Sequence, residues 1–105
     1  MPRVSVGRSD QVPEGEARRF EVGEHEIAVA NLGGGDFRAV GDICSHALAY
    51  LHEGEVDVED RTIECPKHGS VFDLDSGVPK SLPATAPVPV YEVAADGDEL
   101  KVEIE

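Results

Sequence analysis

The chain has 105 residues, of which 40% are hydrophobic and 30% are charged, a length and composition typical of a globular protein with one domain. Its 22 acidic and nine basic side chains give a formal net charge of −13. A surface this negative repels phosphate backbones, which argues against nucleic acid as a partner and favours a partner with a basic docking patch. A plainer interpretation is that the acidity only maintains solubility.

The sequence contains no sign of membrane insertion or export. No apolar run is long enough to cross a bilayer, and the N-terminal stretch MPRVSVGRSDQVPEGE lacks the apolar core of a signal peptide. We therefore expect one domain over residues 1–105, located in the cytoplasm, with no membrane contact. We also expect a monomer.

Strand patterns dominate both ends of the chain. Alternation of apolar and polar residues predicts strands at residues 2–8, 17–23, 25–32, 37–42, 88–95 and 99–105. The glycine-rich stretches GGGD (33–36) and DGD (96–98) predict hairpin turns between neighbouring strands. The polar segment 9–17 has room for a single helical turn, and the sequence shows no long amphipathic helix.

The middle of the chain has a different character. Strand patterns there are short, at residues 54–58, 61–65 and 70–75, and glycine and proline are frequent between them. We therefore expect an all-β fold. Its basal part would comprise about residues 1–41 and 88–105, and a loop-rich insert would comprise about residues 42–87.

Two short segments of this insert each hold one cysteine and one histidine, which are side chains that bind metals. Cys44 and His46 are separated by one residue, and Cys65 and His68 by two. Thiolate and imidazole are the preferred protein ligands of iron, zinc and copper. Zinc fingers usually place a cysteine pair before a histidine pair, whereas each segment here offers one of each. This arrangement suits a dinuclear centre, with both cysteines on one iron, both histidines on the other and two bridging sulfides.

Other interpretations of the same residues stay open at this point. A disulfide between Cys44 and Cys65 is possible, although a cytoplasmic location disfavours it and it leaves the histidines unexplained. A single zinc ion would use the same four side chains. A cysteine nucleophile would need one reactive thiol with an orienting partner, which two equivalent pairs fit poorly. The last alternative is that the four residues are unrelated to one another.

The order of these residues resembles a known family signature. CSH followed by CPKHGSVFD is similar to the C-x-H…C-P-x-H-G-x-x-F-D pattern of Rieske-type [2Fe–2S] ferredoxins, and the similarity extends over about residues 38–93. The resemblance implies a small barrel or sandwich of antiparallel sheets with a loop-rich cluster-binding part. It also implies one [2Fe–2S] cluster, with Cys44 and Cys65 on the inner iron and His46 and His68 on the outer iron near the surface.

The resemblance also assigns roles to residues near these ligands. Gly69 would allow an unusual backbone angle or a close approach to the cluster. The stretch SLPATAPVP (81–89), which includes Pro83, would cover one side of the cluster. High-potential respiratory members carry a serine and an aromatic hydroxyl that donate hydrogen bonds to sulfur; here Ser70 is retained, but Phe72 has no hydroxyl. We therefore expect a reduction potential in the lower part of the range of about −150 to +300 mV for such centres.

The function that the resemblance implies is one-electron transfer without catalysis. The chain would take electrons from a ferredoxin reductase and pass them to a terminal non-haem iron oxygenase. Alternatives are a Rieske ferredoxin of another pathway, such as iron–sulfur cluster assembly, and a structural zinc module.

Two further classes of protein are disfavoured. An oxygenase needs a second iron site, for which only His25 and His52 remain. We expect His25 to be an exposed or packed imidazole. We expect His52, which follows the first ligand loop, to be a plain surface residue, and the alternative is that it tunes the charge of the site. A cluster-free subunit, as in the small subunit of some nitrite reductases, is disfavoured because all four ligands are present.

Overall fold

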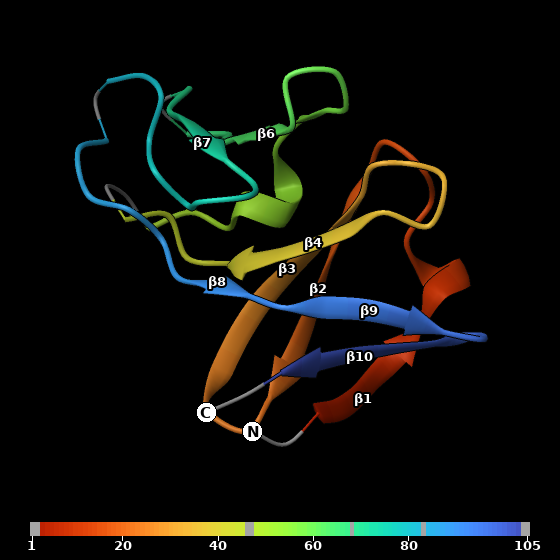
Figure 1. Cartoon of the computed structure of the whole chain (residues 1–105). Coiled ribbons are helices and arrows are strands. Elements are labelled where there is room, and N and C mark those ends of the chain that lie inside the picture. The colour runs from red at the N-terminus through yellow and green to blue at the C-terminus, as the bar shows by residue number, and fades with distance from the viewer. Residues whose placement is uncertain (1–2, 46–47, 68, 83, 104–105) are drawn as a thin grey trace.

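The computed structural model describes residues 3–45, 48–67, 69–82 and 84–103. Within these residues the chain forms ten strands and two short 3-10 helices. The strands form three antiparallel sheets (Figure 1). This architecture confirms the expected all-β fold class.

Two sheets form the basal end of the molecule, where both termini lie (Figure 1). The first has the strand order β1-β10-β9, with β1 at Arg3–Arg8, β9 at Val93–Asp96 and β10 at Glu99–Glu103. The second has the order β2-β3-β4-β8, with β2 at Ala17–Val22, β3 at His25–Asn31, β4 at Phe37–Gly41 and β8 at Val90–Tyr91. Both predicted hairpin turns are confirmed, between β3 and β4 and between β9 and β10.

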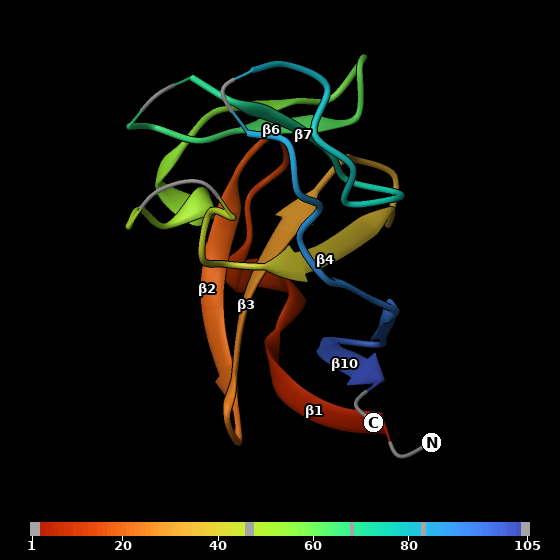
Figure 2. The ribbon, with the colours of Figure 1, turned by 90° about the vertical axis from the view of Figure 1, so that its left-hand side faces the viewer.

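The third sheet, called the upper sheet below, lies at the opposite end of the molecule from the termini (Figures 1 and 2). Its strands are β5 at Val56–Asp57, β6 at Thr62–Glu64 and β7 at Val71–Asp73, paired in chain order. All three are short because glycine, proline and charged residues interrupt the apolar pattern on both sides.

Strand β3 separates two hydrophobic cores. Successive side chains of a strand point to opposite faces, and Ile27 and Val29 pack into a basal core with residues of β10. Ala28 and Ala30 face the other way, into an upper core that also contains both cysteines. The strand is therefore buried on both faces, and its small alanine side chains face the core beneath the upper sheet.

The structure departs from the sequence predictions in two places. Residues 88–95 were expected to form one strand, but Tyr91 pairs with β4 whereas Val93 pairs with β10. The chain thus changes sheets near Glu92, which divides one apolar pattern into two strands. The 3-10 helix η2 at Leu51–Glu53 was not expected, whereas η1 at Ser9–Gln11 confirms the predicted helical turn. None of the helices among the described residues is long and apolar enough to cross a membrane.

Candidate metal centre

The first loop, residues 43–50, follows β4 and carries Cys44. Its base is closed by an antiparallel bridge between Ile43 and Tyr50 and by a hydrogen bond of 3.0 Å from the Cys44 N–H to the Ala49 carbonyl. The Cys44 side chain is buried. His46, the second predicted ligand of this loop, lies outside the described residues.

The second loop, residues 65–70, is the hairpin turn between β6 and β7. The Cys65 N–H donates to the Ser70 carbonyl at 2.7 Å, and the Gly69 N–H donates to the Cys65 carbonyl at 3.0 Å. Gly69 has a φ of +73°, which confirms the expected unusual backbone angle. A Cβ at this position would meet no described atom within 4 Å, and the expected close approach of Gly69 to the cluster stays a prediction. His68 lies outside the described residues.

Both cysteines contribute to the same apolar core. Cys44 and Cys65 pack in the upper core with Leu51, Ile63 and Phe72. The two cysteines, which both belong to the described part of the chain, are not joined by a disulfide. Phe72 is fully buried, so this position fills the core beside the cysteines and supplies no hydroxyl. Two thiols are thus presented from two loops in a largely water-free environment, which suits ligands of a buried metal centre.

The proline loop, residues 81–89, is hydrogen-bonded to both ligand loops. The Ser45 hydroxyl donates to the Ala86 carbonyl at 2.6 Å, and the Ala84 N–H donates to the Ser70 hydroxyl oxygen at 3.1 Å. The three loops therefore gather at one end of the upper part of the molecule, the end that faces the viewer in Figure 2. Pro83 lies outside the described residues, and its predicted covering role stays a prediction.

Ser70 is fully buried, so it is more than an ordinary exposed turn residue. Its oxygen accepts the Ala84 N–H, and this bond leaves the hydroxyl proton available for donation, because a hydroxyl can donate one hydrogen bond while it accepts another. The predicted hydrogen bond from Ser70 to a cluster sulfur is compatible with this arrangement and stays a prediction.

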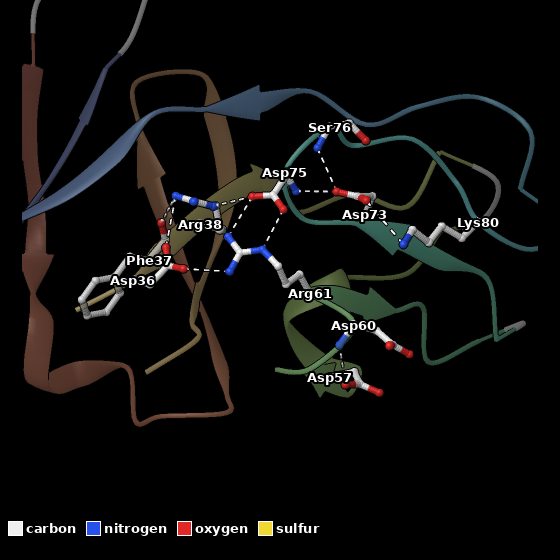
Figure 3. Close-up of polar contacts among 10 residues, drawn as sticks. All are labelled: Asp36, Phe37, Arg38, Asp57, Asp60, Arg61, Asp73, Asp75, Ser76 and Lys80. Atoms are coloured by element: carbon white, nitrogen blue, oxygen red, sulfur yellow. Dashed lines mark hydrogen bonds and ion pairs between the residues drawn. The ribbon is translucent and has the colours of Figure 1, made fainter. Parts of the chain in front are cut away.

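A ring of four charged side chains joins the β3–β4 turn to the upper sheet (Figure 3). Arg61 donates two hydrogen bonds to Asp75, at 2.8 and 2.9 Å, and one to Asp36 at 2.8 Å. Arg38 pairs with Asp75 at 2.6 Å and with Asp36 at 3.2 Å. The hydrogen bonds from Arg61 hold the pKa of the Asp75 carboxyl well below its ordinary value. The sequence reasoning did not identify this charge ring.

The two remaining histidines are both packed against neighbours. The His25 ring contacts the Tyr91 hydroxyl at 3.2 Å, which confirms one of the two expected environments. The prediction for His52 was wrong. Its ring is partly buried and lies 2.8 Å from a carboxylate oxygen of Asp42, which is itself fully buried. The local sequence gave no sign of this pair because the burial of Asp42 depends on distant strands.

Leucines of the first loop and the proline loop are largely exposed, and the second loop exposes Lys67. Leu48 in the first loop is 93% exposed and Leu82 in the proline loop 78% exposed. A run of exposed acidic residues, called the acidic run below, lies along η2, β5 and β6. It comprises Glu53, Glu55, Asp57, Glu59, Asp60 and Glu64, most of which line a shallow hollow over the upper sheet.

The described residues fit a [2Fe–2S] cluster. The fit rests on two buried thiols that share one core and are not bonded to each other. A buried hydroxyl also lies at the end of the second loop. The histidine half of the predicted ligand set lies outside the described residues.

Comparison with known proteins agrees with this fit. The Rieske [2Fe-2S] domain family matches residues 3–92. The 3-phenylpropionate/cinnamic acid dioxygenase ferredoxin subunit of Escherichia coli strain K12 is 41% identical over 104 residues, which cover 99% of this chain and 95% of that protein.

Two solved structures extend the similarity to the fold. The ferredoxin of carbazole 1,9a-dioxygenase from Nocardioides aromaticivorans IC177 superposes with a TM-score of 0.92 at 37% identity, over 100% of both chains. A chain from a complex of reduced oxygenase and oxidized ferredoxin in carbazole 1,9a-dioxygenase superposes with a TM-score of 0.83 at 38% identity, over 95% of this chain and 100% of that one. The chain therefore belongs to the Rieske [2Fe-2S] family, whose members hold one [2Fe–2S] cluster.

Proposed function

We propose that this protein is the ferredoxin component of a multi-component dioxygenase, taking single electrons from a reductase and delivering them to a terminal oxygenase. The observation that carries the proposal is 41% identity over nearly the whole chain to a dioxygenase ferredoxin subunit. A related ferredoxin has been solved in a complex with its oxygenase. The division into a basal part (1–41 and 88–105) and a cluster-binding part (42–87), a monomeric state and a cytoplasmic location belong to the same proposal.

The proposed ligands of the cluster are Cys44 and Cys65 on one iron and His46 and His68 on the other. When bound, the cluster supplies reversible one-electron chemistry, at a potential raised by the replacement of two thiolates with imidazoles. The protein's own contribution is to hold the two thiols in an apolar core and to limit the access of water to them. Backbone hydrogen bonds at the base of each loop keep the thiol-bearing residues in place.

The surface near the ligand loops suits transient docking to a redox partner. Leu48 and Leu82 are apolar side chains that a partner surface would cover. The acidic run adds negative charge to the same part of the molecule, from Glu64 next to Cys65 to the β5–β6 turn at the other end of β6. Opposite charge on the partner raises the rate of encounter, and salt reduces this advantage. We therefore propose that the partners dock through a basic patch.

The cofactor assignment is tested by composition and spectroscopy of the purified protein. Two irons and two acid-labile sulfides per chain, with a Rieske-type EPR signal after reduction by dithionite, are expected. One zinc ion per chain without an EPR signal would refute the assignment and favour a structural zinc module.

The docking proposal is tested by neutralising charges in matched positions. One triple variant combines Glu55→Gln, Asp57→Asn and Glu59→Gln. At low salt it should accept electrons from the reductase roughly tenfold more slowly than the wild type, and this difference in rate should shrink at high salt. The control neutralises three exposed acids at the basal end, Glu24, Asp98 and Glu99, with the same change in net charge. Equal slowing by both triple variants would mean that net charge alone matters and would refute docking at the acidic run.

A further inference from the structure

We propose that Asp42 is a positioning residue of the first loop and that it acts through His52. The inference rests on the proposed function, because it assumes that the first loop carries cluster ligands. Asp42 is one of three buried residues with polar or charged side chains among those that the structure describes, and its side chain is fully buried. It precedes the first loop directly, and His52 follows that loop in η2.

Asp42 contacts the chain on the far side of the loop through both its backbone and its carboxylate. Its carbonyl accepts the Leu51 N–H at 2.7 Å. One carboxylate oxygen accepts the His52 backbone N–H at 2.9 Å, and the two oxygens lie 3.0 and 2.8 Å from His52 Nδ1. These distances place the His52 ring nitrogen within hydrogen-bond reach of both carboxylate oxygens. One residue thus closes the loop from both sides.

Asp42 is also anchored to the basal sheet, through its backbone and its carboxylate. The Asp42 N–H donates to the Glu26 carbonyl on β3 at 2.9 Å. The guanidinium of Arg19 on β2 lies 3.5 Å from a carboxylate oxygen of Asp42 and also forms ion pairs with Glu21 and Glu26. This cation offsets the cost of burying the carboxylate, which would be large without a partner.

An aromatic side chain completes the network. The Tyr50 ring lies under the Arg19 guanidinium, at 5.2 Å, and 5.8 Å from the His52 ring. Tyr50 is also the residue that bridges to Ile43 at the base of the first loop. The network therefore connects the sheet β2–β3, the start of the loop and its end. Its removal should leave the fold in place and loosen the segment that carries Cys44 and His46.

The test compares three histidine variants of the cluster-loaded protein. His52→Ala removes the ring and its hydrogen bond, whereas His52→Asn keeps an N–H donor close to the Nδ1 position. His25→Ala is the matched control, because His25 is another partly buried histidine with one polar contact, to Tyr91 of β8 instead of the first loop. Each variant is reduced with dithionite, and release of iron to bathophenanthroline disulfonate is followed well below the unfolding temperature.

We expect His52→Ala to release iron roughly tenfold faster than the wild type, the range seen when groups that orient metal ligands are removed. Its reduced-state EPR lines should also broaden. His52→Asn should restore both properties to within about twofold, and His25→Ala should resemble the wild type. Asp42→Asn provides a second variant and should also accelerate release, because it removes the charge that both His52 and Arg19 face.

Three results would overturn the inference. The first is release of iron by His52→Ala at the wild-type rate. The second is behaviour of His52→Asn like that of His52→Ala, and the third is equally accelerated release by His25→Ala. The first result would mean that His52 has no role in holding the first loop. The second would mean that packing of the ring, and not its hydrogen bond, slows iron release. The third would mean that any general loss of stability accelerates release. Wild-type protein that binds no iron or sulfide would instead refute the proposed function, and the positioning role would fall with it.

Discussion

The two ligand loops hold chemically equivalent residues by different means. The second loop is a hairpin turn whose closing bonds, from Cys65 to Ser70 and from Gly69 to Cys65, lie within the loop itself. The first loop also has a bridge at its base, but its ends are pinned by Asp42. The buried carboxylate of Asp42 faces Arg19 of β2, and its backbone N–H donates to the Glu26 carbonyl of β3. A loop that carries one cysteine and one histidine can therefore be held in place either by its own hydrogen bonds or by contacts with strands far away in the sequence.

This difference determines which substitutions should affect each loop. A short hairpin loses little chain entropy on closing, because its ends are close in sequence. Its weak points are therefore the backbone angle and the hydrogen bonds of its own residues. The first loop depends on residues of β2 and β3, so remote substitutions should reach it more easily. Only the loss of a cysteine should affect both loops equally.

The largest expected effect is loss of either cysteine. Cys44→Ser and Cys65→Ser should each abolish cluster binding, because a hydroxyl replaces the soft thiolate that iron–sulfur centres require. Iron, sulfide and visible absorbance should fall to background in both variants. Their free energies of unfolding should match that of wild-type protein from which the cluster has been removed, since the cluster stabilises only the folded state. A variant that keeps its cluster would contradict the ligand assignment for that loop.

The next effect concerns the hydroxyl at the end of the second loop. Ser70→Ala leaves the buried Ala84 N–H without its acceptor, which should lower the free energy of unfolding by about 1–3 kcal/mol. It should also lower the reduction potential, since a hydrogen bond to sulfur favours the reduced cluster. Potentiometric titration and chemical denaturation measure the two effects separately.

Ser81→Ala is the matched control for this serine. The Ser81 hydroxyl accepts the Val71 N–H at 2.9 Å, so its loss should cost a similar hydrogen bond without changing the potential. A potential unchanged by Ser70→Ala would show that this serine serves only to hold the proline loop. Equal shifts in both variants would assign the change to the loosened loop.

Much of this architecture could be predicted from local patterns. Alternating apolar residues located the strands because burial on one face of a sheet repeats every second residue. The spacing of Cys44, His46, Cys65 and His68 indicated the candidate centre, and Gly69 indicated a special backbone angle. Each of these signals lies within a few neighbouring residues, where sequence reasoning works well.

The features that were missed depend on tertiary contacts. Nothing in the stretch GDIC marks Asp42 as buried, because its charge partner Arg19 lies on another strand. The charge ring likewise assembles from residues far apart in the chain, including Asp36 and Asp75. The split between β8 and β9 was missed because the alternation of VPVYEV continues through the change of sheet. In all three cases, contacts with residues far away in the sequence determine the structure.

A smaller effect should follow from substitution of Gly69. A Cβ there meets open space among the described residues, so Gly69→Ala isolates the strain of a positive φ, which costs about 1–2 kcal/mol for a residue with a side chain. Gly97→Ala is a close control, because Gly97 has a φ of +61° and equally open surroundings in the turn between β9 and β10.

Both glycine variants should lose similar free energy of unfolding, as measured in urea. Only Gly69→Ala should also change the EPR spectrum of the reduced protein, because only its turn carries a ligand. Identical spectra for both variants and the wild type would mean that the second loop tolerates strain without moving its cysteine, and that its position is fixed by the strands on either side.

The smallest effect is expected at the charge ring, which ties the β3–β4 turn to the sheet that bears the second loop. Asp75 is 45% exposed, so solvent screens its pairs, and Asp75→Asn should cost about 0.5–1 kcal/mol of unfolding free energy at pH 7. The folded-state pKa of Asp75 is lowered chiefly by hydrogen bonds from Arg61. The stability that the ionised Asp75 adds to the folded protein is therefore fully present above the ordinary aspartate pKa of about 3.9. It disappears as the pH falls below that value.

Urea unfolding of the wild type and the Asp75→Asn variant checks this sign. The difference between them should be constant from about pH 8 to pH 5 and should shrink below about pH 4. Asp98→Asn is the control, because Asp98 is 82% exposed and lies 3.9 Å from its partner Arg8, so its removal should cost almost nothing. A difference that grew in acid would contradict the assignment of the lowered pKa to Asp75. If cluster release is also unchanged in Asp75→Asn, the second loop depends only on its own hairpin, as its local hydrogen bonds imply.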